Sequence, residues 1–68
     1  MIFLIEYDRS RGQIVTFETF SDSERRAAED SRLELEIMLN VNNVDHEVVL
    51  LEADSEEALR RTHRRYFE

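Results

Sequence analysis

Residues 2–7 read Ile-Phe-Leu-Ile-Glu-Tyr, an apolar run rich in β-branched and aromatic side chains and too short for a helix, so it predicts a strand. Residues 8–12 follow with turn-forming side chains and end in Gly12, the only glycine of the chain. Residues 13–20 read Gln-Ile-Val-Thr-Phe-Glu-Thr-Phe and predict a second strand. Together these segments predict a β-hairpin with a loop of about five residues.

The register of this hairpin decides which side chains face the core, because successive residues of a strand point to opposite faces. With Tyr7 opposite Gln13, the core face would carry Phe3, Ile5, Tyr7, Val15 and Phe17. The other face would carry a mixed set: Ile2, Leu4, Glu6, Ile14, Thr16 and Glu18. Since the first strand is apolar on both faces, we place it at the centre of the sheet.

A long helix is predicted after the hairpin. Residues 21–24 match the Ser-x-x-Glu capping box, so the helix should begin at about Asp22. It should end at about Asn40, because asparagines tolerate left-handed backbone conformations. Small and apolar residues share one side of this helix and predict its core stripe: Ala27, Ala28, Ser31, Leu35, Met38 and Leu39.

A third strand over residues 46–53 is predicted from its Val-Val-Leu-Leu centre, and a last helix over about residues 55–67, with Asp54 as its N-cap. The predicted fold class is therefore α+β, with the element order ββαβα in one small domain, residues 1–68. We expect a three-stranded sheet of order 2-1-3 that is mixed, because the long helix returns the chain parallel to the second strand. Both helices are expected on one face of the sheet, as in a split β-α-β arrangement.

Composition narrows the function classes. The chain has 68 residues, no cysteine, 16 acidic residues and nine basic residues that are all arginine, for a net charge of −7. Without cysteine there are no disulfides or thiolate metal sites. The apolar first strand lacks the basic leader and cleavage site of a signal peptide, and no apolar run has the length of a membrane span, so we expect a cytoplasmic protein.

No motif for catalysis or cofactor binding is present, and we predict neither an enzyme nor a cofactor or metal site. Asp45-His46-Glu47 resembles a ligand cluster, but neighbours in a strand point to opposite faces, so we interpret it as an exposed polar segment. His63 lies on the apolar side of the last helix and is interpreted as a partly buried structural histidine.

The last nine residues differ in charge from the remainder of the chain. They hold four arginines and one glutamate, whereas residues 1–59 hold five arginines and 15 acidic residues. The arginines could bind an acidic protein surface or, beside two aromatic residues, a nucleic acid; they could also be a solvated helix face. The acidic body of the chain argues against nucleic acid. The candidate residues are Arg60, Arg61, Arg64 and Arg65.

Two apolar surfaces are left without a predicted cover. With both helices on one face of the sheet, the opposite face would expose Ile2, Leu4 and Ile14. Leu33, Ile37 and Val41 lie on the outer side of the long helix, where either the last helix or the loop containing Val44 covers them, or a partner does. We therefore expect a non-catalytic interaction or regulatory module that forms a homodimer through the sheet face or the edge of strand 46–53.

Overall fold

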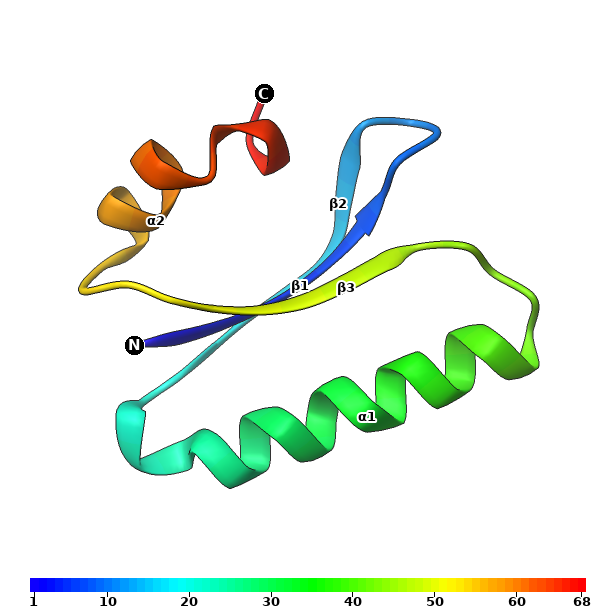
Figure 1. Ribbon diagram of the computed structural model, residues 1–68, viewed down its shortest axis with the longest axis horizontal. Helices are drawn as coiled ribbons and strands as arrows, with labels where there is room; N and C mark the ends of the chain where they lie inside the picture. The colour runs from blue at the N-terminus through cyan, green and yellow to red at the C-terminus, as the bar shows by residue number, and fades with distance from the viewer.

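In the computed structural model, which describes residues 1–68, three strands lie between two helices (Figure 1). The strands are β1 (Ile2–Asp8), β2 (Gln13–Phe20) and β3 (Glu47–Glu52). The helices are α1 (Arg25–Val41) and α2 (Glu56–Thr62), and two short 3-10 helices, η1 (Asp22–Glu24) and η2 (Arg64–Tyr66), precede α1 and follow α2. The α+β class is confirmed.

The sheet has the predicted strand order, β2-β1-β3. However, β1 pairs antiparallel with both of its neighbours, so the prediction of a mixed sheet is wrong. The long helix does return the chain parallel to β2, but β1 separates β2 from β3, and the two parallel strands share no ladder. Every hydrogen-bonded strand pair is therefore antiparallel.

The two helices lie on opposite faces of the sheet and not on one face as predicted (Figure 1). Leu59 of α2 and Tyr66 of η2 pack with Phe3 and Ile5 in one buried cluster. Ile2 and Leu4 point to the other face of β1, where α1 buries Ala28 and Leu39. Because β1 is apolar on both faces, each face needs a cover, and one helix supplies each.

A β-bulge corrects the predicted register of the hairpin. Glu6 pairs with Thr16 but Tyr7 pairs with Ile14, so Val15 is the extra residue on β2. Beyond the bulge the faces exchange: Ile14 packs with Tyr7 on the α2 side, while Val15, predicted in the core, is 55% exposed. Gly12 has a φ of +66° in the loop that closes this hairpin.

The predicted signals mark the start and end of the long helix and the start of the last one to within a few residues. The Glu24 carboxylate accepts the Ser21 N–H at 2.8 Å, as expected for the capping box, and α1 ends before Asn43, whose φ is +56°. In the last helix Ser55 and not Asp54 is the N-cap, and its hydroxyl accepts the Ala58 N–H. The prediction that this helix continues to about residue 67 is wrong, because α2 ends at Thr62 and the 3-10 helix η2 follows from Arg64.

Candidate functional site

An apolar stripe runs along the side of α1 that faces away from the sheet. Leu33, Ile37 and Val41 are spaced four residues apart and are 56%, 54% and 73% exposed. Met38, which was predicted in the core stripe, is 52% exposed beside these residues, and Val44 just beyond the helix is also exposed. We call these five residues the outer face of α1. Since the stripe is exposed, neither α2 nor the loop around Val44 covers it, and the alternative of a partner surface remains.

The charges around the outer face are mainly acidic. Glu34 lies on the exposed surface of α1 without an ion pair, and Glu36 is paired only with Arg32, at 3.3 Å. The last turn of α1 contains no basic residue, in contrast to α2, which ends with Arg60 and Arg61. No basic side chain therefore offsets the negative end of the α1 dipole, which lies beside Val41 at the end of the stripe.

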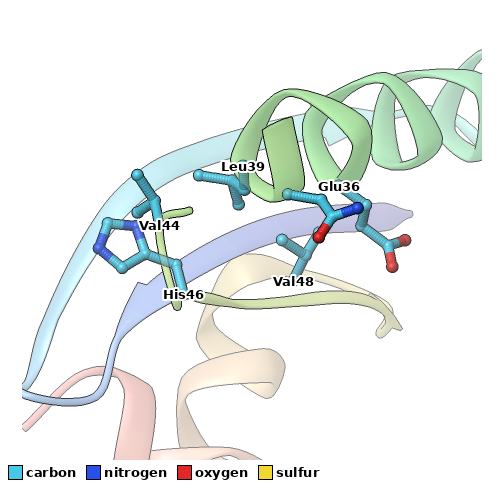
Figure 2. A pocket seen from close by; sticks show the side chains of 6 residues that line it. Glu36, Leu39, Val44, His46 and Val48 are labelled. Atoms are coloured by element: carbon cyan, nitrogen blue, oxygen red, sulfur yellow. The ribbon is translucent and has the colours of Figure 1, made fainter. Parts of the chain in front are cut away.

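A hollow of about 200 Å³ adjoins the outer face between the end of α1 and β3 (Figure 2). Its lining comes from α1, the loop after it and β3: Glu36, Leu39, Asn40, Val44, His46 and Val48. Val44 belongs to both the hollow and the outer face. The hollow thus offers a depression beside the stripe into which a partner side chain could extend.

The sheet residues predicted as a contact surface are not available for one. Ile2 is 0% and Leu4 1% exposed, because α1 covers their face of the sheet. Ile14 is half-buried against the cluster of Phe3 and Ile5 on the α2 side. The physical reason is the placement of one helix on each face, which leaves no open sheet face.

Two of the four candidate arginines are held by contacts within the chain. Arg60 pairs with Glu56 at 2.9 Å, and its guanidinium lies 4.4 Å from the centre of the Phe67 ring. Arg65 donates to the Glu47 carboxylate at 2.6 Å and lies 4.2 Å from the centre of the Tyr66 ring. Only Arg61 and Arg64 lack an ion pair.

The aromatic residues near these arginines are also occupied. Tyr66 is buried, and its hydroxyl donates to Glu47 at 2.6 Å. Burial, and then the hydrogen bond to Glu47, raise the pKa of Tyr66 to about 12, while the hydrogen bonds from Arg65 and Tyr66 lower the pKa of Glu47. Phe67 packs edge-on against Phe17 at 6.0 Å between ring centres. These rings support the fold and do not form an exposed stacking platform, which weakens the nucleic-acid hypothesis.

Sequence reasoning missed a buried polar cluster around Glu6. Glu6 is 4% exposed; its carboxylate lies 2.6 Å from Nδ1 of His46 and accepts the Thr16 hydroxyl at 2.7 Å. Nε2 of His46 lies 3.6 Å from Asp8, whose pKa is lowered mainly by its hydrogen bond from the Ser10 hydroxyl. Interpretation of His46 as an exposed residue was therefore wrong. The signal was present in the sequence, since Glu6 in a central apolar strand requires a polar partner.

The polar cluster around Glu6 is held together by hydrogen bonds. No three histidine, cysteine or acidic side chains lie where they could hold a metal ion. Its groups satisfy one another, and no buried side-chain nitrogen or oxygen lacks a hydrogen-bond partner. None of the helices has the length and apolar character needed to cross a membrane.

Comparison with protein-family models, with curated proteins and with solved structures gives no match for this chain. The assignment of function below therefore depends on the surface geometry.

Proposed function

We propose that this protein is a non-catalytic interaction module that binds an amphipathic helix of a partner protein on the outer face of α1. The partner helix would place an apolar side against Leu33, Ile37 and Val41 and carry basic residues on its flanks. The observation that supports the proposal is the exposure of three large apolar side chains in a straight line on a regular helix.

This stripe is not required by the fold. α1 covers the sheet with its opposite side, where Ala28 and Leu39 are buried. Solvent-exposed positions of a helix tolerate glutamate, lysine or glutamine at no cost in packing. Three aliphatic residues on the outer side therefore add no packing within the isolated chain. Such residues are typical of a surface that is covered in a complex.

The charges favour a basic partner over a second copy of this chain on the same face. Glu34 and Glu36 flank the stripe, and the whole chain carries a net charge of −7. The C-terminal end of α1, beside Val41, is the negative end of the helix dipole. A second α1 would bring these same acidic groups together, which opposes association. Arginines or lysines beside the apolar side of a partner helix would instead complement Glu34, Glu36 and the helix end.

The proposal can be tested with a synthetic amphipathic helix of about 18 residues that has a leucine stripe flanked by arginines. Fluorescence anisotropy would measure its binding to the wild-type chain, to Ile37→Ser and to Val15→Ser. The two replaced residues are 54% and 55% exposed, so the variants lose similar apolar surface on different elements. We expect Ile37→Ser to weaken binding by about tenfold and Val15→Ser to leave it unchanged.

A second peptide with glutamates in place of the arginines tests the charge of the occupant. We expect it to bind at least tenfold more weakly at low salt. Equal effects of Ile37→Ser and Val15→Ser would show that α1 is not the binding surface. Equal binding of the two peptides, or sedimentation showing that wild-type chains dimerise and Ile37→Ser chains do not, would contradict a basic helix as the occupant.

A further inference from the structure

β3 forms an edge of the sheet whose outward backbone groups can be assigned. The Ala53 N–H donates to the Met1 carbonyl, and the Met1 amino group donates to the Ala53 carbonyl. Met1 and Ala53 therefore form a hydrogen-bonded pair in the register that continues with Ile2 opposite Glu52. Hydrogen-bonded and non-hydrogen-bonded pairs alternate in an antiparallel ladder. Val49 and Leu51 thus bond to β1, whereas Val48, Leu50 and Glu52 direct their N–H and C=O groups away from it.

This edge lacks the usual protections against pairing. Its four central residues, 48–51, are aliphatic and half-buried, and they include no proline, no charge and no bulge. The two glutamates that close the strand are held by arginines of the same chain, Glu47 by Arg65 and Glu52 by Arg25. The opposite edge differs, because the bulge at Val15 distorts β2 and Glu18 lies exposed on it.

We infer that β3 pairs with β3 of a second copy, antiparallel about a two-fold axis, to give a continuous six-stranded sheet. The strand is compatible with its own copy for a simple geometric reason. Residues directly opposite in an antiparallel pair point to the same face. Glu47 shares the α2 face with Val49 and Leu51, whereas Glu52 shares the α1 face with Val48 and Leu50. Registers centred on Val49 or Leu50 therefore never place two glutamates opposite each other.

In such a dimer the outward groups of Val48 and Leu50 would bond across the axis, and the outer face of α1 would stay exposed on each copy. The inference is thus independent of the proposed partner helix. Because one short strand per copy makes the contact, the interface is well below the roughly 1,600 Å² of a standard stable complex. We expect a weak dimer, with a dissociation constant of roughly 100 μM.

Val48→Pro and Val48→Ala form a matched pair of variants for the test. Both lose the valine side chain, but only proline removes the outward N–H, and proline is tolerated at an edge position whose N–H faces solvent. Sedimentation equilibrium from 10 μM to 1 mM should show dimers of the wild type and of Val48→Ala. For the Val48→Pro chain, the dissociation constant of the dimer should rise at least tenfold. Circular dichroism would confirm that this variant is folded.

Amide hydrogen exchange gives a test that needs no variant. In a monomer the Leu50 amide points to solvent and should exchange rapidly, whereas the Val49 amide is protected by β1. In the dimer the Leu50 amide becomes protected as the concentration rises. A wild-type chain that is monomeric at 1 mM, or a Leu50 amide whose exchange does not change with concentration, would overturn the inference even if Val48→Pro fails to fold.

Discussion

The variants Leu59→Ala and Leu33→Ala compare how much a buried and an exposed leucine contribute to the free energy of unfolding. Leu59 is 0% exposed and packs with Phe3, Ile5 and Tyr66, whereas Leu33 is 56% exposed on the outer side of α1. Truncation of a fully buried leucine typically costs 2–5 kcal/mol, so we expect a loss of about 3 kcal/mol for Leu59→Ala. For Leu33→Ala we expect a change within about 0.5 kcal/mol, because little packing is lost and alanine favours the helix.

The magnitude matters because the domain is small. At about 0.05–0.15 kcal/mol per residue, a chain of this length has a total stability of about 3–10 kcal/mol. Loss of Leu59 should therefore remove a large part of it, and urea unfolding followed by circular dichroism would measure both variants. Equal losses for the two variants, or a loss below about 1 kcal/mol for Leu59→Ala, would refute the placement of α2 over Phe3 and the exposure of the α1 stripe.

Three further predictions concern the polar groups and the hairpin loop. His46→Ala should lower the free energy of unfolding by about 1–3 kcal/mol, because Glu6 stays buried with only Thr16 as a side-chain partner. The control His63→Ala removes a ring without hydrogen bonds and should cost less than half as much, with urea unfolding as the measurement for both variants. Tyr66 should ionise near pH 12 in an ultraviolet titration. Since the folded state holds this proton more tightly than the unfolded state, whose tyrosine has a pKa near 10, the free energy of unfolding should fall as the pH rises from about 10 to 12. Tyr66→Phe should lose less stability than the wild type over the same pH range. Gly12→Ala should lower the free energy of unfolding by about 1 kcal/mol, because alanine disfavours a φ of +66°; an unchanged urea midpoint would show that the loop relaxes without strain.

Local patterns in the sequence predicted the elements because each pattern has a local cause. The apolar run of β1, the Ser21–Glu24 capping box and the asparagines after α1 act within a few residues of one another. The end of the last helix at His63 has no comparable signal, since no glycine or proline marks it. Tyr66 instead leaves the helical path to pack into the core, where it contacts Tyr7 edge-on at 5.1 Å between ring centres.

The arrangement of the elements depended on interactions between distant residues. The bulge at Val15 shifts Ile14 to the α2 side, and nothing in the hairpin sequence distinguishes Val15 from Ile14 as the extra residue. The side of the sheet taken by α2 follows from the apolar character of both faces of β1, which was visible but was attributed to an open face. The apolar spacing of the outer stripe of α1 is readable from the sequence, but the sequence does not decide whether the last helix or the loop around Val44 covers it. The pairing of Glu6 with His46 joins residues 40 positions apart.

β1 supplies four of the eight buried hydrophobic residues, and all of its packing partners come later in the chain. Its partner β3 lies about 40 to 50 positions further on, and Leu59 and Tyr66 close the α2 side only near the C-terminus. On the ribosome, β1 would therefore emerge with both of its apolar faces exposed to solvent. Stable tertiary structure would have to wait until Leu59 and Tyr66 have left the exit tunnel, so β1 would lack its cover on the α2 side during most of the synthesis of this domain.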